Sequence, residues 1–204
     1  MTRAVTALGL MSGTSLDGID LALLKTDGAA EIDFMRDGFV AYAPELRALL
    51  RGVLDAAADW PTAQLKNPDD WPSQLKEAAA AVTQAHIAAV EGFLEPDSAP
   101  ALIGFHGQTI SHRPAEGFTL QIGDGQALAA ATGSDLVGQF RLNDMRHGGQ
   151  GAPLAPLFHA ALAGEARPQA VLNLGGVGNI TWLGADDAML AFDTGPANAL
   201  IDDW

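Results

Sequence analysis

The sequence predicts an α/β protein with a mixed sheet flanked by helices, followed by the beginning of a second, similar unit. Three short apolar runs at the start of the chain are separated by turn residues, which is typical of an antiparallel meander. Two stretches with helical spacing come next, and short strands then alternate with a helix. Near the end of the sequence, an apolar run, a glycine turn and another apolar run repeat the plan of the opening.

The first half of the chain divides into strands and then helices. Apolar runs predict strands at Val5–Leu10, Ile19–Leu24 and Ile32–Ala41. Apolar residues at helical spacing predict helices at Pro44–Ala58 and Ser73–Leu94, the second with Ser73 as its N-cap. The stretch between them is rich in Pro, Asp and Trp and is expected to form a loop.

The second half alternates short strands with a short helix. We expect strands at residues 101–106, 118–123 and 134–140, and a helix at residues 124–133. Residues 139–158 are rich in Gly, Pro and polar side chains, which predicts a segment that lines a site. Two strands flank a glycine turn within residues 169–184, and a last strand ends at Asp193. Pro196 is expected at the first position of a helix.

These elements predict two units of unequal completeness. We expect a first domain at residues 1–138, a crossing segment at 139–168 and the start of a second domain at 169–204. The final residues have a helical pattern with no Gly or Asn stop signal. The sequence therefore predicts a fragment of a longer two-domain protein. An unfinished second domain would expose apolar faces and self-associate.

Composition and charge narrow the classes of function. The formal charge is −14, from 11 basic and 25 acidic residues, so nucleic acid and anionic lipid are not expected as partners. With no cysteine in the chain, disulfides and thiolate metal sites are excluded. The apolar runs are shorter than a membrane span and lack the organisation of a signal peptide. These observations fit a cytoplasmic protein.

The stretch "GLMSGTSLDGIDLALL", residues 9–24, places a polar glycine turn between two apolar runs. Such a turn can point several backbone N–H groups into one concavity that binds anions. Thr14 and Ser15 add hydroxyl donors, and Asp17 is a candidate ligand for Mg²⁺ through water. A strand follows the turn, which excludes both the Walker P-loop and the Rossmann fingerprint. The alternative is that Gly13 and Gly18 only close a hairpin.

A second glycine turn strengthens the phosphate-binding interpretation. Gly175, Gly176 and Asn179 lie in the turn of residues 169–184. Two facing turns of this kind, one from each unit, would hold the phosphates of a nucleotide between them.

Three polar groups of residues remain as candidates for substrate chemistry. The run "FHGQTISHRP" places His106, Gln108, Thr109 and His112 after a buried strand. This mixture of donors and acceptors suits a neutral polar ligand such as a sugar. A metal site and a loop whose polar groups bond one another are the alternatives. Arg141 and Arg146 indicate a carboxylate or phosphate partner, or a surface ion pair with Asp144. The third candidate, Asp193, is either a helix cap or a carboxylate that takes a proton.

Six stretches in chain order carry a resemblance to a known family. They are "GLMSGTSLDGIDLAL", "GFHGQTISHRP", "LQIGDGQALA", "GGQGAPLAPLFHAAL", "LNLGGVGNIT" and "FDTGPANALIDDW". Together they resemble the anhydro-N-acetylmuramic acid kinase family of the sugar-kinase/Hsp70/actin superfamily, which has a ribonuclease H-like fold. Residues 28–100 contain no distinguishing motif, and Ala197 stands where the family usually has a second glycine.

The resemblance implies a bacterial, ATP-dependent enzyme of cell-wall recycling. The reaction opens 1,6-anhydro-N-acetylmuramic acid with water and yields N-acetylmuramic acid 6-phosphate, with ATP and Mg²⁺ as cofactors and a homodimer as the complete protein. Asp193 is then the general base, and His106, Gln108 and Arg141 lie near the sugar. The expected contacts to ATP are Gly13, Thr14, Ser15, Leu16, Asp17, Gly18, Ile19, Asp20, Gly175, Gly176 and Asn179. A non-catalytic sugar- or nucleotide-binding half-domain is the alternative.

Overall fold

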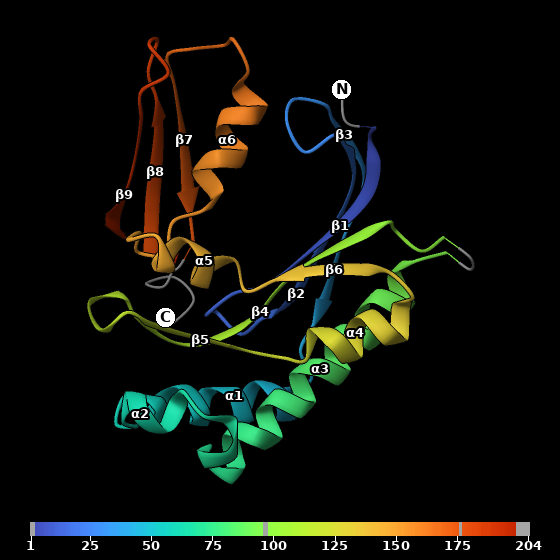
Figure 1. The fold of residues 1–204 in the computed structure, drawn as a ribbon, viewed down its shortest axis with the longest axis vertical. Helices are drawn as coiled ribbons and strands as arrows, with labels where there is room; N and C mark the ends of the chain where they lie inside the picture. The colour runs from blue at the N-terminus through green and yellow to red at the C-terminus, as the bar shows by residue number, and fades with distance from the viewer. Residues whose placement is uncertain (1–2, 96–97, 176, 199–204) are drawn as a thin grey trace.

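Two β-sheets of unequal size organise the chain (Figure 1). The computed structural model describes residues 3–95, 98–175 and 177–198. The larger sheet has six strands in the order β3-β2-β1-β4-β5, with β6 pairing with β4, and the smaller has the order β7-β8-β9. The two sheets lie on either side of the segment between β6 and β7 (Figure 1).

The larger sheet begins with the predicted meander. Strands β1 (Val5–Ser12), β2 (Gly18–Thr26) and β3 (Ile32–Ala41) pair antiparallel. Strand β4 (Leu102–Arg113) pairs parallel with β1 and with β6 (Asp135–Gly138), and antiparallel with β5 (Phe118–Ile122). The expected mixed sheet is therefore confirmed.

The helices of this unit gather on one side of the larger sheet (Figure 1). They are α1 (Pro44–Ala57), α2 (Thr62–Leu65), α3 (Ser73–Phe93) and α4 (Gly125–Thr132), with short 3-10 turns at Pro68–Asp70 and Pro114–Glu116. Alternate strand residues such as Leu8 and Leu10 are buried in one core with Leu50 and Val82 of the helices. Each such side chain contributes about 1.5–3 kcal/mol on burial.

Two local predictions in this unit are wrong. Ser73 is the first residue of α3, not its N-cap, because Pro72 occupies the cap position and no side chain caps the helix. The stretch before α3 is not a simple loop, since it contains α2 and a 3-10 turn. The Trp71 indole Nε1 donates to the Leu65 carbonyl at 2.9 Å, and this contact fixes that segment.

Strand β4 is longer than predicted, and it includes the polar run that follows Phe105. His106, Gln108, Thr109 and His112 lie within β4 and not in a loop after it. The polar side chains are accommodated because β5 offers partners: Gln121 Nε2 donates to Thr109 Oγ1 at 3.3 Å, and His112 Nδ1 bonds Thr119 Oγ1 at 3.1 Å.

The segment expected to line a site contains two helices. They are α5 (Phe140–Arg146) and α6 (Ala155–Ala163), and only the stretch between them is glycine-rich and without regular structure. The glycine-rich composition is therefore confined to residues 147–154, and the flanking parts of the segment are helical.

The smaller sheet is an antiparallel meander of β7 (Gln169–Leu174), β8 (Val177–Leu183) and β9 (Met189–Pro196). This confirms the predicted strands around the second glycine turn. Pro196 ends β9 and does not begin a helix there, while the residues beyond Asn198 lie outside the described part of the chain. Helix α6 contacts β8 through a 2.9 Å hydrogen bond between His159 Nδ1 and Thr181 Oγ1.

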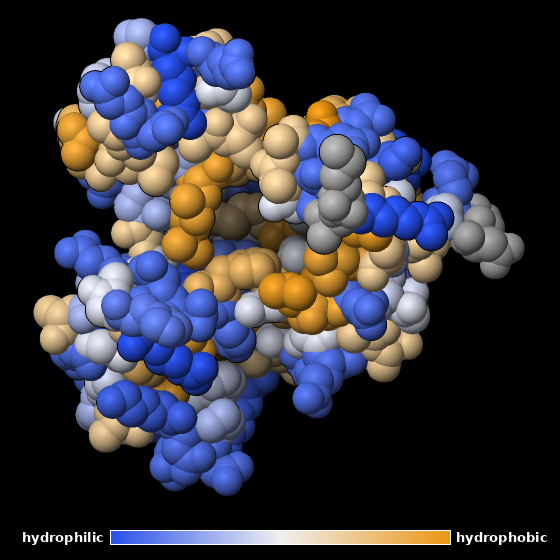
Figure 2. Space-filling model, turned by 45° about the horizontal axis from the view of Figure 1, so that its top comes forward, coloured by the Kyte–Doolittle hydropathy of each residue, from blue (hydrophilic) through white to orange (hydrophobic). Residues whose placement is uncertain are grey.

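The side of the larger sheet away from its helices is open and partly apolar. The strand registers place five exposed apolar side chains on it: Val5, Met11, Phe34, Phe39 and Val137. Figure 2 shows a hollow between this sheet and the second unit, bordered by apolar side chains. The hollow therefore separates the two units that carry the two glycine turns.

Candidate functional site

The first glycine turn is a tight reversal between β1 and β2. Its Gly13 carbonyl accepts hydrogen bonds from Leu16 N at 3.3 Å and from Gln108 Nε2 at 3.0 Å. Leu16 has a φ of 57° and is 1% exposed, so its side chain turns into the core while the backbone of Thr14 and Ser15 stays at the surface. Within the described residues, the N–H groups of Thr14 and Ser15 have no hydrogen-bond partner. This arrangement suits an anion.

One carboxylate, Asp17, contacts this turn directly, and a second, Asp20, interacts with the charge of Asp17. Asp17 Oδ1 accepts from Ser15 Oγ at 2.6 Å and from Gly18 N at 3.1 Å. Burial raises the pKa of Asp20, and the charge of Asp17 raises it further. Oxygen ligands of this kind fit a Mg²⁺ ion that keeps most of its water. No group of three His, Asp or Glu side chains in the described part of the chain forms a closed metal site.

Gly107 joins the first turn to a histidine–arginine pair. Its φ is +71°, and an added Cβ would lie 2.6 Å from the Ile122 carbonyl oxygen, so only glycine fits. The Gly107 carbonyl accepts from Ser12 Oγ at 3.2 Å and bonds His106 Nδ1 at 2.7 Å. The turn and His106 are thereby connected through a single carbonyl group.

His106 is held neutral between two partners. Arg141 Nε donates to His106 Nε2 at 3.1 Å, so the ring proton sits on Nδ1 and is donated to Gly107. Burial lowers the pKa of His106, and the Arg141 charge lowers it further. Arg141 is fixed in turn because its NH1 donates to the Gly151 carbonyl at 3.1 Å.

The alternative of an ion pair with Asp144 is wrong for the described residues. Asp144 Oδ2 instead accepts from Gly151 N at 2.7 Å, and the only ion pairs found there join Arg36 to Glu95 and Arg167 to Asp187. Burial also lowers the pKa of Arg141. Its positive charge is thus held by neutral groups and remains available to an anionic ligand.

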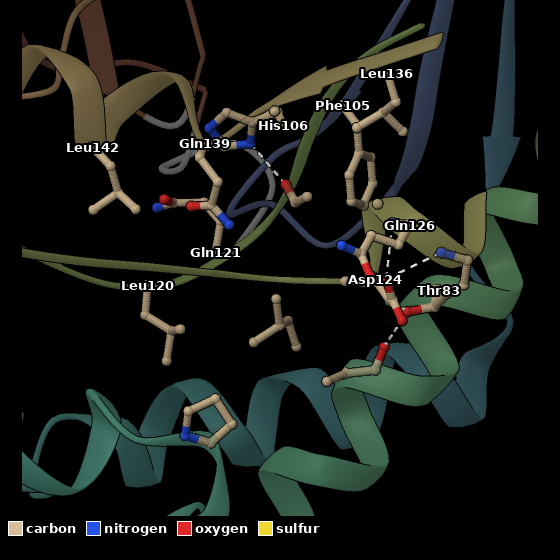
Figure 3. Close-up of a pocket in the computed structure, with 18 of the residues that line it drawn as sticks. Thr83, Phe105, His106, Leu120, Gln121, Asp124, Gln126, Leu136, Gln139 and Leu142 are labelled. Atoms are coloured by element: carbon tan, nitrogen blue, oxygen red, sulfur yellow. Dashed lines mark hydrogen bonds between the residues drawn. The ribbon is translucent and has the colours of Figure 1, made fainter. Parts of the chain in front are cut away.

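A cavity of about 1300 Å³ is lined in part by His106, the histidine of this pair. Figure 3 shows His106, Gln121 and Gln139 on one side of it and Thr83, Asp124 and Gln126 at one end. Asp124 caps α4 by accepting from Gln126 N at 2.9 Å. The cavity combines apolar walls, such as Phe105 and Leu136, with several polar groups, which is the usual composition of a small-molecule site.

The second glycine turn brings two further candidates together. Asn179 lies directly opposite Asp193 in the β8–β9 pairing, with a register shift beside them. Asp193 is exposed, and the Gly175 carbonyl accepts from Asn198 N at 2.9 Å. Gly176 lies outside the described residues. Strands β7 and β9 both run toward α5 (Figure 1), so this end of the smaller sheet is directed at the segment that carries Arg141.

The structure therefore places the candidate site residues in two separate groups. One contains the first turn, Gln108, His106 and Arg141, and the other contains Asn179 and Asp193. No hydrogen bond between the two groups occurs in the described residues. Sequence reasoning missed Tyr42, whose N donates to the Asp17 carbonyl at 3.0 Å. As the only tyrosine of the chain, it had no pattern around it that pointed to this contact.

These features define an α/β protein with a mixed sheet, a tight glycine turn between two of its strands and a second, smaller sheet. The chain belongs to the anhydro-N-acetylmuramic acid kinase family, whose model matches residues 5–204. This membership agrees with the sugar-kinase/actin type of fold that the sequence motifs implied. Among the described residues, no helix has the length and apolar character required to cross a membrane.

Curated relatives support this membership. A protein from Rhizorhabdus wittichii named anhydro-N-acetylmuramic acid kinase is 52% identical over 210 residues, covering 100% of this chain and 56% of the relative. One of the same name from Rhizobium etli is 48% identical over 209 residues, covering 98% and 55%. The chain thus spans about half the length of the curated relatives it matches. A solved exopolyphosphatase-like protein is similar to this chain at a TM-score of 0.42 and 14% sequence identity. The match covers 95% of this chain and 52% of that protein.

Proposed function

We propose that this chain supplies the phosphate-binding turns and the general base of an ATP-dependent kinase. The substrate would be 1,6-anhydro-N-acetylmuramic acid, and the product N-acetylmuramic acid 6-phosphate, in cytoplasmic recycling of the bacterial cell wall. The observation that carries the proposal is the first turn, where the N–H groups of Thr14 and Ser15, close to Asp17, have no hydrogen-bond partner in the part of the chain that the structure describes. Curated relatives named as this kinase support the choice of reaction.

The first turn is proposed to bind the ATP phosphates. The N–H groups and hydroxyls of Thr14 and Ser15 donate to phosphate oxygens, and Gly175 and Asn179 contribute from the second turn. Asp17, with Asp20 nearby, would hold Mg²⁺ through water, and the ion would supply neutralising charge to the phosphates. The remaining turn residues, Leu16, Gly18 and Ile19, are proposed to shape this site through their backbone.

The sugar is proposed to bind near the His106–Arg141 pair. The muramic acid skeleton carries a carboxylate on its lactyl group, and the half-buried Arg141 guanidinium is a suitable partner for it. The adjoining cavity of about 1300 Å³ offers room for the ring and its acetamido group. Gln108, which was expected near the sugar, is completely buried, and its side-chain amide donates to the Gly13 carbonyl, so we assign it to the first turn instead.

Asp193 is proposed to take the proton of the attacking water. As the water oxygen bonds to the anomeric carbon, the bond from that carbon to the bridging oxygen breaks. The bridging oxygen then receives the γ-phosphoryl group, and ADP leaves. Asp193 is exposed, and Asn179 lies opposite it across the β8–β9 pairing, so the carboxylate is accessible to a water and has a polar neighbour. General bases of this kind contribute about 10²–10⁴-fold to rate.

The test is Asp193→Asn in the full-length protein, with product followed by mass spectrometry. We expect turnover to fall at least about 100-fold while ATP affinity is kept, since the substitution removes the base but not the phosphate turns. Asp186→Asn is the matched control, because Asp186 is an exposed carboxylate in the β8–β9 turn. Near-normal turnover by the Asp193 variant would exclude the assigned role.

A second candidate function is a non-catalytic sugar- or nucleotide-binding module. The observation that favours it is that the described residues contain an exposed glycine turn and a mixed polar and apolar cavity, which can bind a ligand without any transfer step. Binding of sugar or ATP by the 204-residue chain without turnover would support it. We also propose that the complete protein is a homodimer, which sedimentation analysis of the full-length protein tests.

A further inference from the structure

We propose that Gln108 and Tyr42 are positioning residues that hold the first glycine turn in the shape needed to receive phosphate. The inference rests on the proposed role of that turn. It assigns Gln108 a function through the turn, and it adds Tyr42, which no sequence pattern indicated.

Gln108 anchors the start of the turn from the neighbouring strand. Its side chain is 0% exposed, and Ser12 is its partner in the β1–β4 register. The Nε2 amide donates to the Gly13 carbonyl at 3.0 Å. A buried primary amide is costly unless bonded, so this contact both satisfies Gln108 and fixes the Gly13 carbonyl.

Tyr42 contacts both ends of the same turn. Its backbone N donates to the Asp17 carbonyl at 3.0 Å, at the end of the turn. Its hydroxyl donates to Gln108 Oε1 at 3.4 Å, and through Gln108 it reaches Gly13. The side chain is 7% exposed, and burial raises the pKa of its phenol, which therefore stays a neutral donor. Tyr42, two residues before α1, and Gln108, in the middle of β4, thus meet at the turn.

These bonds determine which backbone groups of the turn remain available. The carbonyls of Gly13 and Asp17 accept hydrogen bonds from Leu16, Gln108 and Tyr42, while Thr14 and Ser15 are exposed and their N–H groups have no partner among the described residues. Leu16 adopts a φ of 57°, which non-glycine residues rarely occupy without support. Donors that are already oriented need no rearrangement when phosphate arrives, and this increases affinity.

The experiment compares Tyr42→Phe and Gln108→Met with the unsubstituted 204-residue chain. Tyr42→Phe deletes one hydroxyl, and Gln108→Met keeps the volume of the buried side chain while removing its amide. Gln64→Met is the matched control, because Gln64 Nε2 also donates to a backbone carbonyl, that of Asp70 at 3.2 Å, on the distant α2. Two readouts are used: amide hydrogen exchange by NMR, and affinity for magnesium tripolyphosphate.

We expect the Leu16 amide, which donates to Gly13, to exchange roughly two- to tenfold faster in both variants relative to the Leu8 amide of β1. Tripolyphosphate affinity should weaken by a similar factor, and the Gln64 variant should change neither value. An equal rise in the exchange rates of the Leu8 and Leu16 amides would show general destabilisation and overturn the proposal. An unchanged exchange rate at Leu16 would overturn it as well. If Gln108→Met does not fold, Tyr42→Phe alone decides.

The exchange readout needs no ligand, so the two proposals fail separately. If tripolyphosphate does not bind the unsubstituted chain, this result contradicts the phosphate-binding role of the turn. The Leu16 exchange rates still show whether Gln108 and Tyr42 hold it in shape.

Discussion

Replacing Gly107 by alanine is expected to destabilise the chain more than the same replacement of another glycine that has a similar backbone angle. Gly107 has a φ of +71°, where a Cβ costs about 1–2 kcal/mol. In addition, the new Cβ would lie 2.6 Å from the Ile122 carbonyl oxygen, and the backbone shift that relieves this contact costs about 1–3 kcal/mol. The sum is about 2–5 kcal/mol.

The variant Gly28→Ala separates the cost of a positive φ from the cost of the close contact with the Ile122 carbonyl oxygen. Gly28 has a φ of +77° and no atom within 4 Å of an added Cβ, so this variant carries the conformational cost without the close contact. Urea unfolding with a slope of about 2 kcal/mol per molar gives an expected midpoint shift of about 1–2.5 M for Gly107→Ala and about 0.5–1 M for Gly28→Ala. Equal shifts for the two variants would refute the argument from the Ile122 contact.

Two further predictions concern pH and self-association. Burial lowers the pKa of His86, His106 and His112, so the unfolded chain binds more protons than the folded one below about pH 6.5, and the free energy of unfolding should fall between about pH 6.5 and 5.5. A urea midpoint that is flat or rises over that range contradicts this. The 204-residue chain should also self-associate, because side chains such as Leu190 and Phe192 of β9 are 59% and 55% exposed. Sedimentation of a single monomeric species at about 100 µM would contradict it.

The elements that could be predicted are those whose pattern is local. Leu8, Leu10 and Leu21 alternate with less buried residues, and this alternation identified the meander. The polar end of β4 could not be recognised in the same way. Its Thr109 and His112 find their partners on β5, and that pairing is invisible in the β4 sequence alone.

The candidate site was predictable as a set of motifs but not as a set of contacts. The first turn could be identified because its glycines and hydroxyl residues are consecutive. The His106–Arg141 bond joins residues 35 positions apart, and the Tyr42–Gln108 bond joins residues 66 apart. Such contacts depend on the order of strands in the sheet, so the sequence could indicate the residues without showing which of them touch.

The measurement that tests the central claim most directly is an NMR titration of the isotopically labelled chain with Mg·ATP. The account predicts that the amide signals of Thr14 and Ser15 shift most, since among the described residues their exposed N–H groups have no hydrogen-bond partner. Saturable shifts confined to other parts of the chain, or no shift at millimolar Mg·ATP, would contradict the assignment of this turn to phosphate.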